Sequence, residues 1–290
     1  MSFPYREWWR QSWLQAKKVK SLWWLGALAA GIDWLSLLFS SEFISFVDRL
    51  SRLKWSALSA VFGPQLLMVY AIGVLLFSII LVGVVMITRA GLLNAIKEGL
   101  GETKPHMWSN VKYGWLNVVK MLIVSAVLFV PLIILAVFYI LSVQNLIGWG
   151  ITLSVFLLVI YTMLMRLVIF NVYGYLFWDN LGWWAALVSG TKLAVRYWKE
   201  TLSVGVIRLA INMVGTVVAM VALLLVLLPF GFVFFVLTMA GMTGVAGVIL
   251  WLGIISGVVA AYFISGWKVC LDFACGMRSY KQFRNDVNSK

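Results

Sequence analysis

Long uninterrupted apolar runs constrain this chain more than any other feature. A helix that crosses a lipid bilayer needs about 20 consecutive, mostly apolar residues, and its backbone polar groups must be hydrogen-bonded within the segment. Six such runs are present in the sequence. They fall at residues 21–39, 63–88, 116–141, 146–170, 204–228 and 232–267, and the last is long enough to include a turn.

The composition agrees with a membrane protein. Hydrophobic residues make up 63% of the chain, charged residues only 11%, and the mean hydropathy is +0.99, whereas about a quarter of the residues in a soluble domain are charged. The runs are continuous, which favours helices over barrel strands that alternate in polarity. The sequence therefore predicts an all-α, polytopic integral membrane protein with six transmembrane helices, forming a single membrane domain over residues 1–290.

The positions of lysine and arginine predict the orientation, because cytosolic loops carry an excess of these residues. With the N-terminus in the cytosol, few of the 23 lysines and arginines lie on the outer side. The outer ones are Arg49, Arg52 and Lys54. Residues 1–20 show no cleavable signal and are expected to be an amphipathic cytosolic segment, and residues 268–290 a basic cytosolic tail. This topology explains the formal net charge of +13 and argues against nucleic-acid binding.

The connections on the inner side are expected to contain amphipathic helices that lie in the membrane interface. In residues 182–200, tryptophans recur at helical spacing, with cations on or near the other side. Indole rings prefer the headgroup boundary, and cations attract anionic lipid. The expected interfacial anchors are Trp108, Trp183, Trp184, Trp198, Lys192 and Arg196.

A spacing of small and apolar residues recurs along the chain. The four residues Gly91, Ala95, Ile96 and Gly99 are spaced like Gly182, Ala186, Leu187 and Gly190. Both sets precede an odd-numbered span. The pattern is compatible with three parallel repeats, each an interfacial helix followed by a two-span hairpin, and it can also arise by chance in so biased a composition.

Three stretches carry a resemblance to a known family. They are "SLWWLGALAAG", "RAGLLNAIKEGLGETKPHMWSNVKYGWLNVVKMLIV" and "DNLGWWAALVSGTKLAVRYWKETLSVGVIRLAI". Nearly the whole chain resembles the glycerophosphoryl diester phosphodiesterase membrane-domain family and related uncharacterised six-span bacterial membrane proteins. The resemblance implies the membrane fold and a place in the bacterial inner membrane. It implies no catalytic residue, because the soluble phosphodiesterase domain that names the family is not in this sequence.

The residues themselves offer little for catalysis. There is one histidine, His106, and there are ten acidic residues, with no G-x-S-x-G, H-E-x-x-H or Walker motif. Cys270 and Cys275 have no further ligands near them in the sequence and are interpreted as small apolar side chains. We therefore expect no enzymatic activity, no metal and no cofactor.

Charges inside the spans are the sharpest candidates for a site, because intramembrane ionisable groups are costly and often functional. Lys120, Arg166 and Arg208 lie at a similar depth near the inner ends of the third, fourth and fifth spans. They form either a basic pocket for a lipid phosphate or another anion, or three side chains that snorkel separately to the interface. Asp33 is either an intramembrane acid or the outer end of a short first span.

Two other features bear on packing. Gly253 and Gly257 have the G-x-x-x-G spacing that permits close helix approach, and Pro131 is expected to kink the third span.

The sequence predicts two classes of function. The first is a non-enzymatic inner-membrane protein that engages anionic lipid headgroups or partner proteins through its cytosolic-face helices, as a scaffold, organiser or accessory subunit. A homo-oligomer is compatible with it. The alternative is a transporter or exporter of a small solute or lipid, with the basic cluster as its binding site. Few polar residues in the spans are available to line a pathway, which ranks this alternative second: Ser125, Ser154, Thr162 and Asn212.

Overall fold

The computed structural model describes residues 3–18, 22–30, 55–100, 106–145 and 147–288, and every element in these ranges is helical. The elements are α1 (Tyr5–Lys18), α2 (Leu22–Ala29), α5 (Trp55–Leu100), α6 (Met107–Gln144), α7 (Gly148–Tyr173), η1 (Gly174–Trp178), α8 (Trp183–Arg196), α9 (Trp198–Met239) and α10 (Thr243–Asn288). Within them, five helical segments are long and apolar enough to cross a membrane. The predicted all-α membrane fold is thus confirmed.

Of the first expected span, residues 21–39, the structure describes only α2 and the residue after it, and Asp33 lies outside the described residues.

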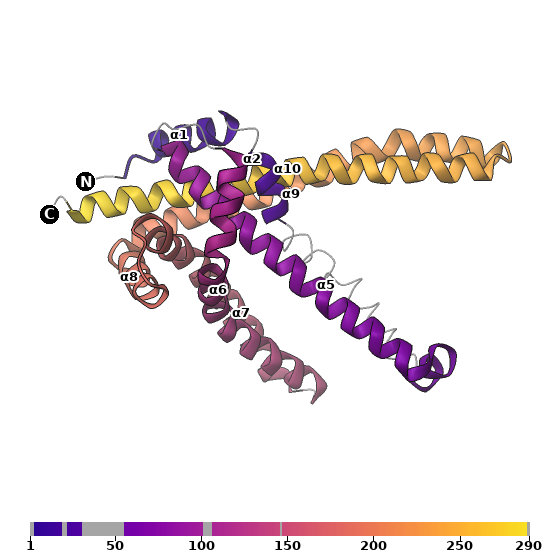
Figure 1. Cartoon of the computed structure of the whole chain (residues 1–290), viewed down its shortest axis with the longest axis horizontal. Coiled ribbons are helices and arrows are strands. Elements are labelled where there is room, and N and C mark those ends of the chain that lie inside the picture. The colour runs from indigo at the N-terminus through magenta and orange to yellow at the C-terminus, as the bar shows by residue number, and fades with distance from the viewer. Residues whose placement is uncertain (1–2, 19–21, 31–54, 101–105, 146, 289–290) are drawn as a thin grey trace.

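Three arms extend from one hub (Figure 1). The α9–α10 hairpin forms one arm, the α6–α7 hairpin forms the second, and the outer part of α5 belongs to the third. The hub contains α1, α2, η1, α8 and the ends of the long helices that meet them. Helix α1 packs on α10, so the first and last helices of the chain meet at the hub.

The buried core lies in the hub. It combines residues from the end of α5, from the junction of α7 with η1, and from the last third of α10. The arms instead expose apolar side chains on their outer surfaces, such as Ile133 on α6 and Leu228 on α9. This distribution suits a protein whose arms lie in lipid, because lipid is as apolar as leucine and does not drive those side chains inward.

Small residues let backbones touch in the hub. A Cβ on Gly26 of α2 would overlap the carbonyl oxygen of Gly266 on α10, and a Cβ on Gly266 would overlap the carbonyl of Trp23. Helices α5 and α6 meet in the same way, where Gly114 faces the carbonyl of Ile87. These positions have no room for any side chain, which fixes how closely the helices approach.

The G-x-x-x-G pair lies inside the α9–α10 hairpin. A Cβ on Gly253 would come within 2.5 Å of the Phe230 side chain, and one on Gly257 within 2.8 Å of the Leu223 side chain. The close approach that this spacing permits therefore joins the two helices of one arm.

Two helix boundaries differ from those expected from the sequence, near residues 91–99 and within residues 182–200. Residues 91–99 do not form a separate interfacial helix, because α5 continues through them to Leu100 and the hub covers them. Their apolar side chains surround the helix, and Leu92, Leu93 and Ile96 are all buried. Similarly, the expected helix over residues 182–200 is two helices, since Tyr197 leaves the helical conformation between α8 and α9.

The boundary between the last two spans also differs from the expectation. Helix α9 continues through Pro229 to Met239, beyond the expected end at residue 228. The turn comes at Gly241, whose φ of 74° suits glycine. The N–H of Met242 donates to the carbonyl of Leu237 and that of Gly241 to Thr238, which is the hydrogen-bond pattern of a Schellman motif.

The expected basic tail is part of a helix. Residues 268–288 are the last turns of α10, and most of them are buried in the hub. Buried apolar residues recur there every three or four positions, as one face of a packed helix requires. They include Val269, Cys270, Phe273, Ala274, Met277 and Tyr280.

Candidate functional site

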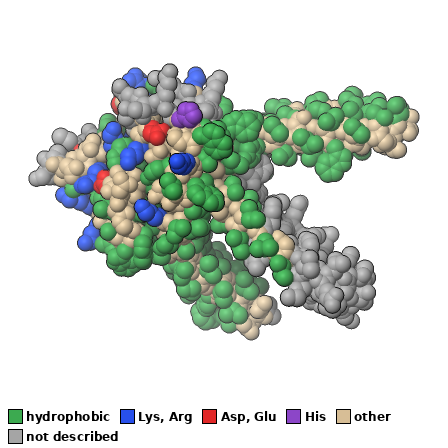
Figure 2. Space-filling model, viewed as in Figure 1, with side chains coloured by type: hydrophobic (Ala, Val, Ile, Leu, Met, Phe, Trp, Pro, Cys, Tyr) green, Lys and Arg blue, Asp and Glu red, His purple; other side chains and the backbone are tan. Residues whose placement is uncertain are grey.

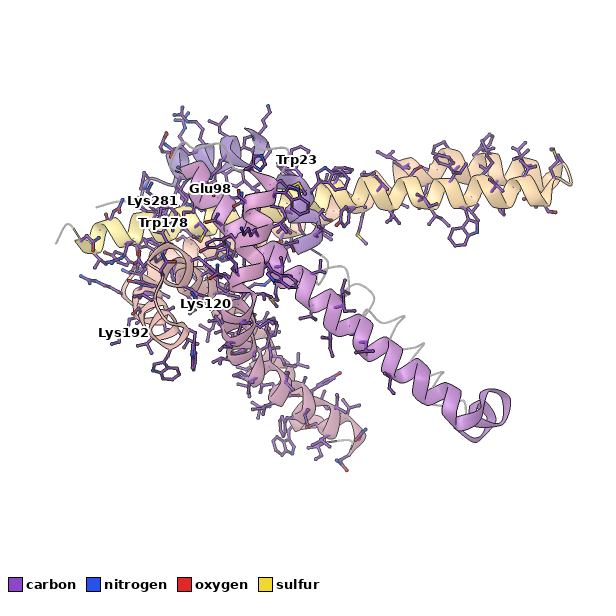
Figure 3. All side chains as sticks on the ribbon, in the orientation of Figure 1. Trp23, Glu98, Lys120, Trp178, Lys192 and Lys281 are labelled. Atoms are coloured by element: carbon purple, nitrogen blue, oxygen red, sulfur yellow. The ribbon has the colours of Figure 1, made fainter. Side chains whose placement is uncertain are left out.

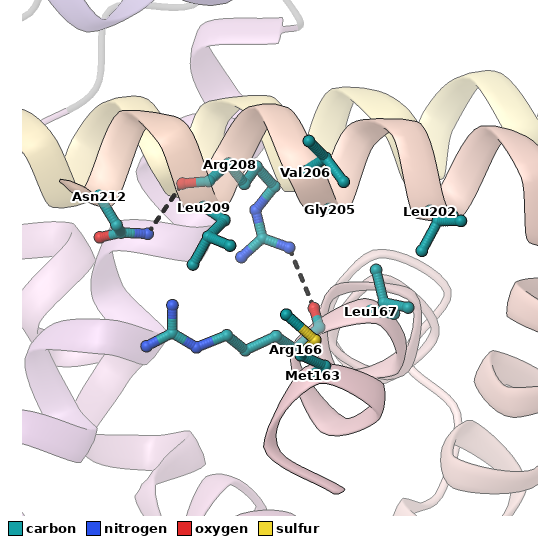
Figure 4. Close-up of a pocket in the computed structure, with 9 residues that line it drawn as sticks. All are labelled: Met163, Arg166, Leu167, Leu202, Gly205, Val206, Arg208, Leu209 and Asn212. Carbon is teal, nitrogen blue, oxygen red and sulfur yellow. Dashed lines mark hydrogen bonds between the residues drawn. The ribbon is translucent and has the colours of Figure 1, made fainter. Parts of the chain in front are cut away.

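A recess of about 70 Å³ lies between α7 and α9, near the point where their arms leave the hub (Figure 4). Its walls are mainly apolar, and its polar lining residues are two arginines and one asparagine. Gly205 of α9 has no side chain where Leu167 of α7 packs against it, and a Cβ there would overlap Leu167 Cδ2. The lining residues are Met163, Arg166, Leu167, Leu202, Gly205, Val206, Arg208, Leu209 and Asn212. We call it the arginine recess.

Arg208 is the buried member of the pair, with 7% of its surface exposed. Its Nε donates to Oδ1 of Asp272 at 2.7 Å and its Nη2 to Oδ2 at 3.0 Å, a bidentate ion pair between α9 and α10. Its Nη1 donates to the backbone carbonyl of Arg166 at 3.1 Å (Figure 4). Its Cζ lies 3.9 Å from the centroid of the Phe170 ring. A buried cation needs this many partners, because desolvation is otherwise costly.

Arg166 is different, because its side chain is exposed at the edge of the recess. Within the described residues, no carboxylate forms an ion pair with it. The recess therefore combines an apolar surface with one guanidinium whose charge is not neutralised by a carboxylate and a second that Asp272 holds in place. Such a surface suits a molecule with an apolar part and an anionic group.

The third predicted cation does not line the recess. Lys120 is exposed on α6, outside the set of lining residues. The structure thus brings together Arg166 and Arg208 and leaves Lys120 on α6, outside the recess.

The sequence reasoning missed Asp272 and Lys268. Both were assigned to the basic tail, yet Asp272 is the ion-pair partner of Arg208, and Lys268 is buried between α9 and α10 with its Nζ 3.4 Å from Oγ1 of Thr216. Their separation by four residues in a stretch of helical periodicity was the available signal.

The predicted interfacial anchors lie on the surface of the hub. Trp108 is 76% exposed, Trp184 and Trp198 are about 60% exposed, and Trp183 is 39% exposed. Lys192 and Arg196 are exposed as well. Helix α8 packs against the hub through the face that carries its small residues, and Ala186 and Gly190 are buried there. A Cβ on Gly190 would collide with the backbone of Val172.

Lysines and arginines gather on the hub, whereas the α6–α7 and α9–α10 arms are covered mainly by apolar side chains on the face shown in Figure 2. Two lysines lie near the ring of Trp178 at the end of η1, and Figure 3 shows one of them, Lys281, close to it. Lys97 Nζ lies 5.9 Å and Lys281 Nζ 5.6 Å from the centroid of the indole ring. Lys97 also donates to the carbonyls of Phe177 and Trp178, at 3.1 and 3.3 Å, and so satisfies the end of the π-helix.

Helix α1 is held in the hub by polar contacts as well as apolar ones. Gln15 donates to the carbonyl of Ile96 at 3.0 Å, and Arg278 donates to the side chains of Gln11 and Gln15. On the solvent side of α1, hydrogen bonds from Gln11 and then Arg10 lower the pKa of the Glu7 carboxyl below its ordinary value.

Among the described residues, no three histidine, cysteine, aspartate or glutamate side chains come together as a metal site. Cys270 and Cys275 are both buried, and no disulfide joins them. Comparison of the chain with protein-family models, curated proteins and solved structures gives no significant match. The geometry of the arginine recess is therefore the basis for assigning a function.

Proposed function

We propose that this protein is a six-span membrane protein that binds an anionic phospholipid in the arginine recess, and that it acts as a scaffold, organiser or accessory subunit and not as an enzyme. The observation that carries the proposal is the recess itself. Its apolar walls suit the glycerol and acyl region of a lipid, and Arg166 offers a guanidinium to the phosphate.

The arrangement of the ends of the chain supports an even number of crossings. Helices α1 and α10 meet in the hub, so the first and last helices lie on the same side of the arms. Five crossings would separate them. An even number of crossings agrees with the six spans expected from the sequence, the first of which is residues 21–39.

The hub is proposed to face the cytosol. Lysines and arginines gather on it, as they do on the cytosolic side of a membrane protein. The exposed tryptophans on the hub, Trp108, Trp184 and Trp198 among them, are expected to mark the headgroup level. The resemblance to the phosphodiesterase membrane-domain family favours the bacterial inner membrane.

Native mass spectrometry of the protein extracted with its lipids tests the proposal. The wild-type protein is expected to retain phosphatidylglycerol in preference to phosphatidylcholine, and Arg166→Ala to lower this retention by about tenfold, which corresponds to about 1.4 kcal/mol. Lys120→Ala is the matched control, because it removes one exposed cation outside the recess, and it should retain lipid like the wild type.

Three results would contradict the proposal. One is a wild-type protein without retained anionic lipid, which would favour the transporter alternative. Another is equal loss of lipid in the Arg166 and Lys120 variants, because the binding would then depend on overall charge. The third is displacement of the lipid by millimolar inorganic phosphate, which would show that the recess takes a free anion.

A further inference from the structure

Lys268 is a buried cation with a single weak partner. Only 7% of the residue is exposed, and its one hydrogen bond among the described residues is the 3.4 Å contact from Nζ to Oγ1 of Thr216. Gly215 of α9 makes room for its side chain, since a Cβ there would lie 2.6 Å from the Lys268 Cγ and Cδ atoms. An ammonium group has three N–H donors, so this lysine is poorly satisfied for so buried a charge.

A carboxylate lies one helical turn away on the same face of α10. Asp272 follows Lys268 by four residues, a spacing that brings two Cβ atoms to about 5–6 Å. In the structure both Asp272 oxygens are bonded to Arg208 instead. The ion pair of Asp272 with Arg208 thus lies one helical turn of α10 from a second buried cation, and the three groups together carry an excess of one positive charge.

The ion pair also limits what Arg208 can offer a ligand. Three of its five N–H donors are in use, and Asp272 takes the parallel Nε and Nη2 pair that best fits a phosphate. A phosphate that enters the recess brings a second negative charge to the same guanidinium. Repulsion between the two anions then favours pairing of the carboxylate with Lys268, the cation one helical turn away on α10.

We infer that Asp272 is a counter-ion shared by Arg208 and Lys268, and that a phosphodiester in the arginine recess transfers it to Lys268. The inference rests on the proposed function and assigns Lys268 a role in it. Lys268 does not touch the ligand and acts as a positioning residue. With the phosphodiester bound, two cations face two anions, so the buried charges balance.

The test compares Lys268→Met with Lys268→Arg in nanodiscs that contain phosphatidylglycerol and phosphatidylcholine. Methionine has a similar length and no charge, so this variant is expected to fold, because it removes a buried charge that has little compensation. We expect it to lower phosphatidylglycerol retention by about tenfold, whereas Lys268→Arg stays within about twofold of the wild type. Lys120→Met serves as the charge-matched control and should leave retention unchanged.

The wild-type measurement separates this inference from the proposed function. If the wild type shows no preference for phosphatidylglycerol, both are rejected. If the wild type prefers it but Lys268→Met does so equally, only the shared counter-ion is rejected. Equal losses in the methionine and arginine variants would reject it too, because they would indicate a packing role. As a second measurement, Lys268→Met should cause no further loss when Asp272 is already replaced by asparagine.

Discussion

Trp8 donates its indole N–H to the backbone carbonyl of Cys275, at 3.2 Å, across 267 positions of sequence. The contact joins α1 to α10, and both residues are at most 2% exposed. The indole ring also lies against Phe3, with ring centroids 6.0 Å apart. The first helix of the chain is therefore part of the core of the hub.

Replacing Trp8 with phenylalanine should destabilise the hub, because it removes the indole hydrogen bond and leaves a smaller ring in a buried position, although the Cys275 carbonyl keeps the Ser279 hydroxyl as a donor. We expect a loss of about 1–3 kcal/mol from the lost hydrogen bond and the smaller ring. Thermal unfolding in detergent measures the change. The matched substitution Trp108→Phe, at an exposed site, should leave the unfolding midpoint unchanged. Equal shifts of the midpoint in the Trp8 and Trp108 variants would contradict the packing of α1 against α10.

The contact between α2 and α10 should not tolerate a methyl group. Gly26→Ala places a Cβ against the carbonyl of Gly266, so the helices must separate, at an expected cost of about 1–3 kcal/mol. Gly73→Ala on α5 is the control, since nothing lies within 4 Å of that site and alanine is the better helix former by about 1 kcal/mol. Opposite shifts of the unfolding midpoint are expected. A Gly26 variant as stable as the wild type would show that the helices are not in contact.

Tyr161 should stabilise the α6–α7 arm through its hydroxyl. The hydroxyl donates to the carbonyl of Leu128 at 2.7 Å, three residues before Pro131, where proline disturbs the hydrogen bonds of α6. Tyr161→Phe is expected to cost about 0.6–1.7 kcal/mol. The measurement is thermal unfolding again, with Tyr139→Phe as the comparison, because no hydrogen bond of that exposed side chain is found in the described structure. Indistinguishable variants would argue against the interhelical bond.

The proposed orientation predicts which side of the membrane single cysteines report. A cysteine in place of Lys192, on α8 of the hub, should react with an impermeant maleimide only in inside-out vesicles. A cysteine in place of Asn145, in the turn between α6 and α7, should react only in intact cells whose outer membrane is permeabilised. The native Cys270 and Cys275 are buried and should give little background. Reversal of the pattern would place the hub outside the cytosol.

The fold class could be predicted because a transmembrane helix is specified locally, by the length of its apolar run. Boundaries were harder to predict. The end of α9 depends on Gly241 adopting a positive φ. Pro229, a residue type that more often ends a helix, lies within α9. Proline is tolerated there because its neighbours in the hairpin can compensate for the missing donor.

The site could be predicted only in part, for a different reason. Intramembrane position identified Arg166 and Arg208, but the same criterion excluded Lys268 and Asp272, which follow the last apolar run in sequence. Their burial arises from packing against α9, a tertiary relationship that a scan for apolar length does not detect. The small and aromatic residues beyond Trp267 recur at helical spacing, and this signal would have predicted that α10 continues as a packed helix through Lys268 and Asp272.

The contact between α1 and α10 also sets an order of events during synthesis. At about 5–20 residues per second, a ribosome needs roughly 10–50 seconds to pass from Trp8 to Cys275, which are 267 positions apart. Throughout that interval the apolar face of α1 lacks its partners on the last turns of α10, while the hairpins enter the bilayer one after another. Assembly of the hub is then a late step that awaits the final turns of α10, and a chain that terminates early would leave its first helix exposed to quality-control proteases.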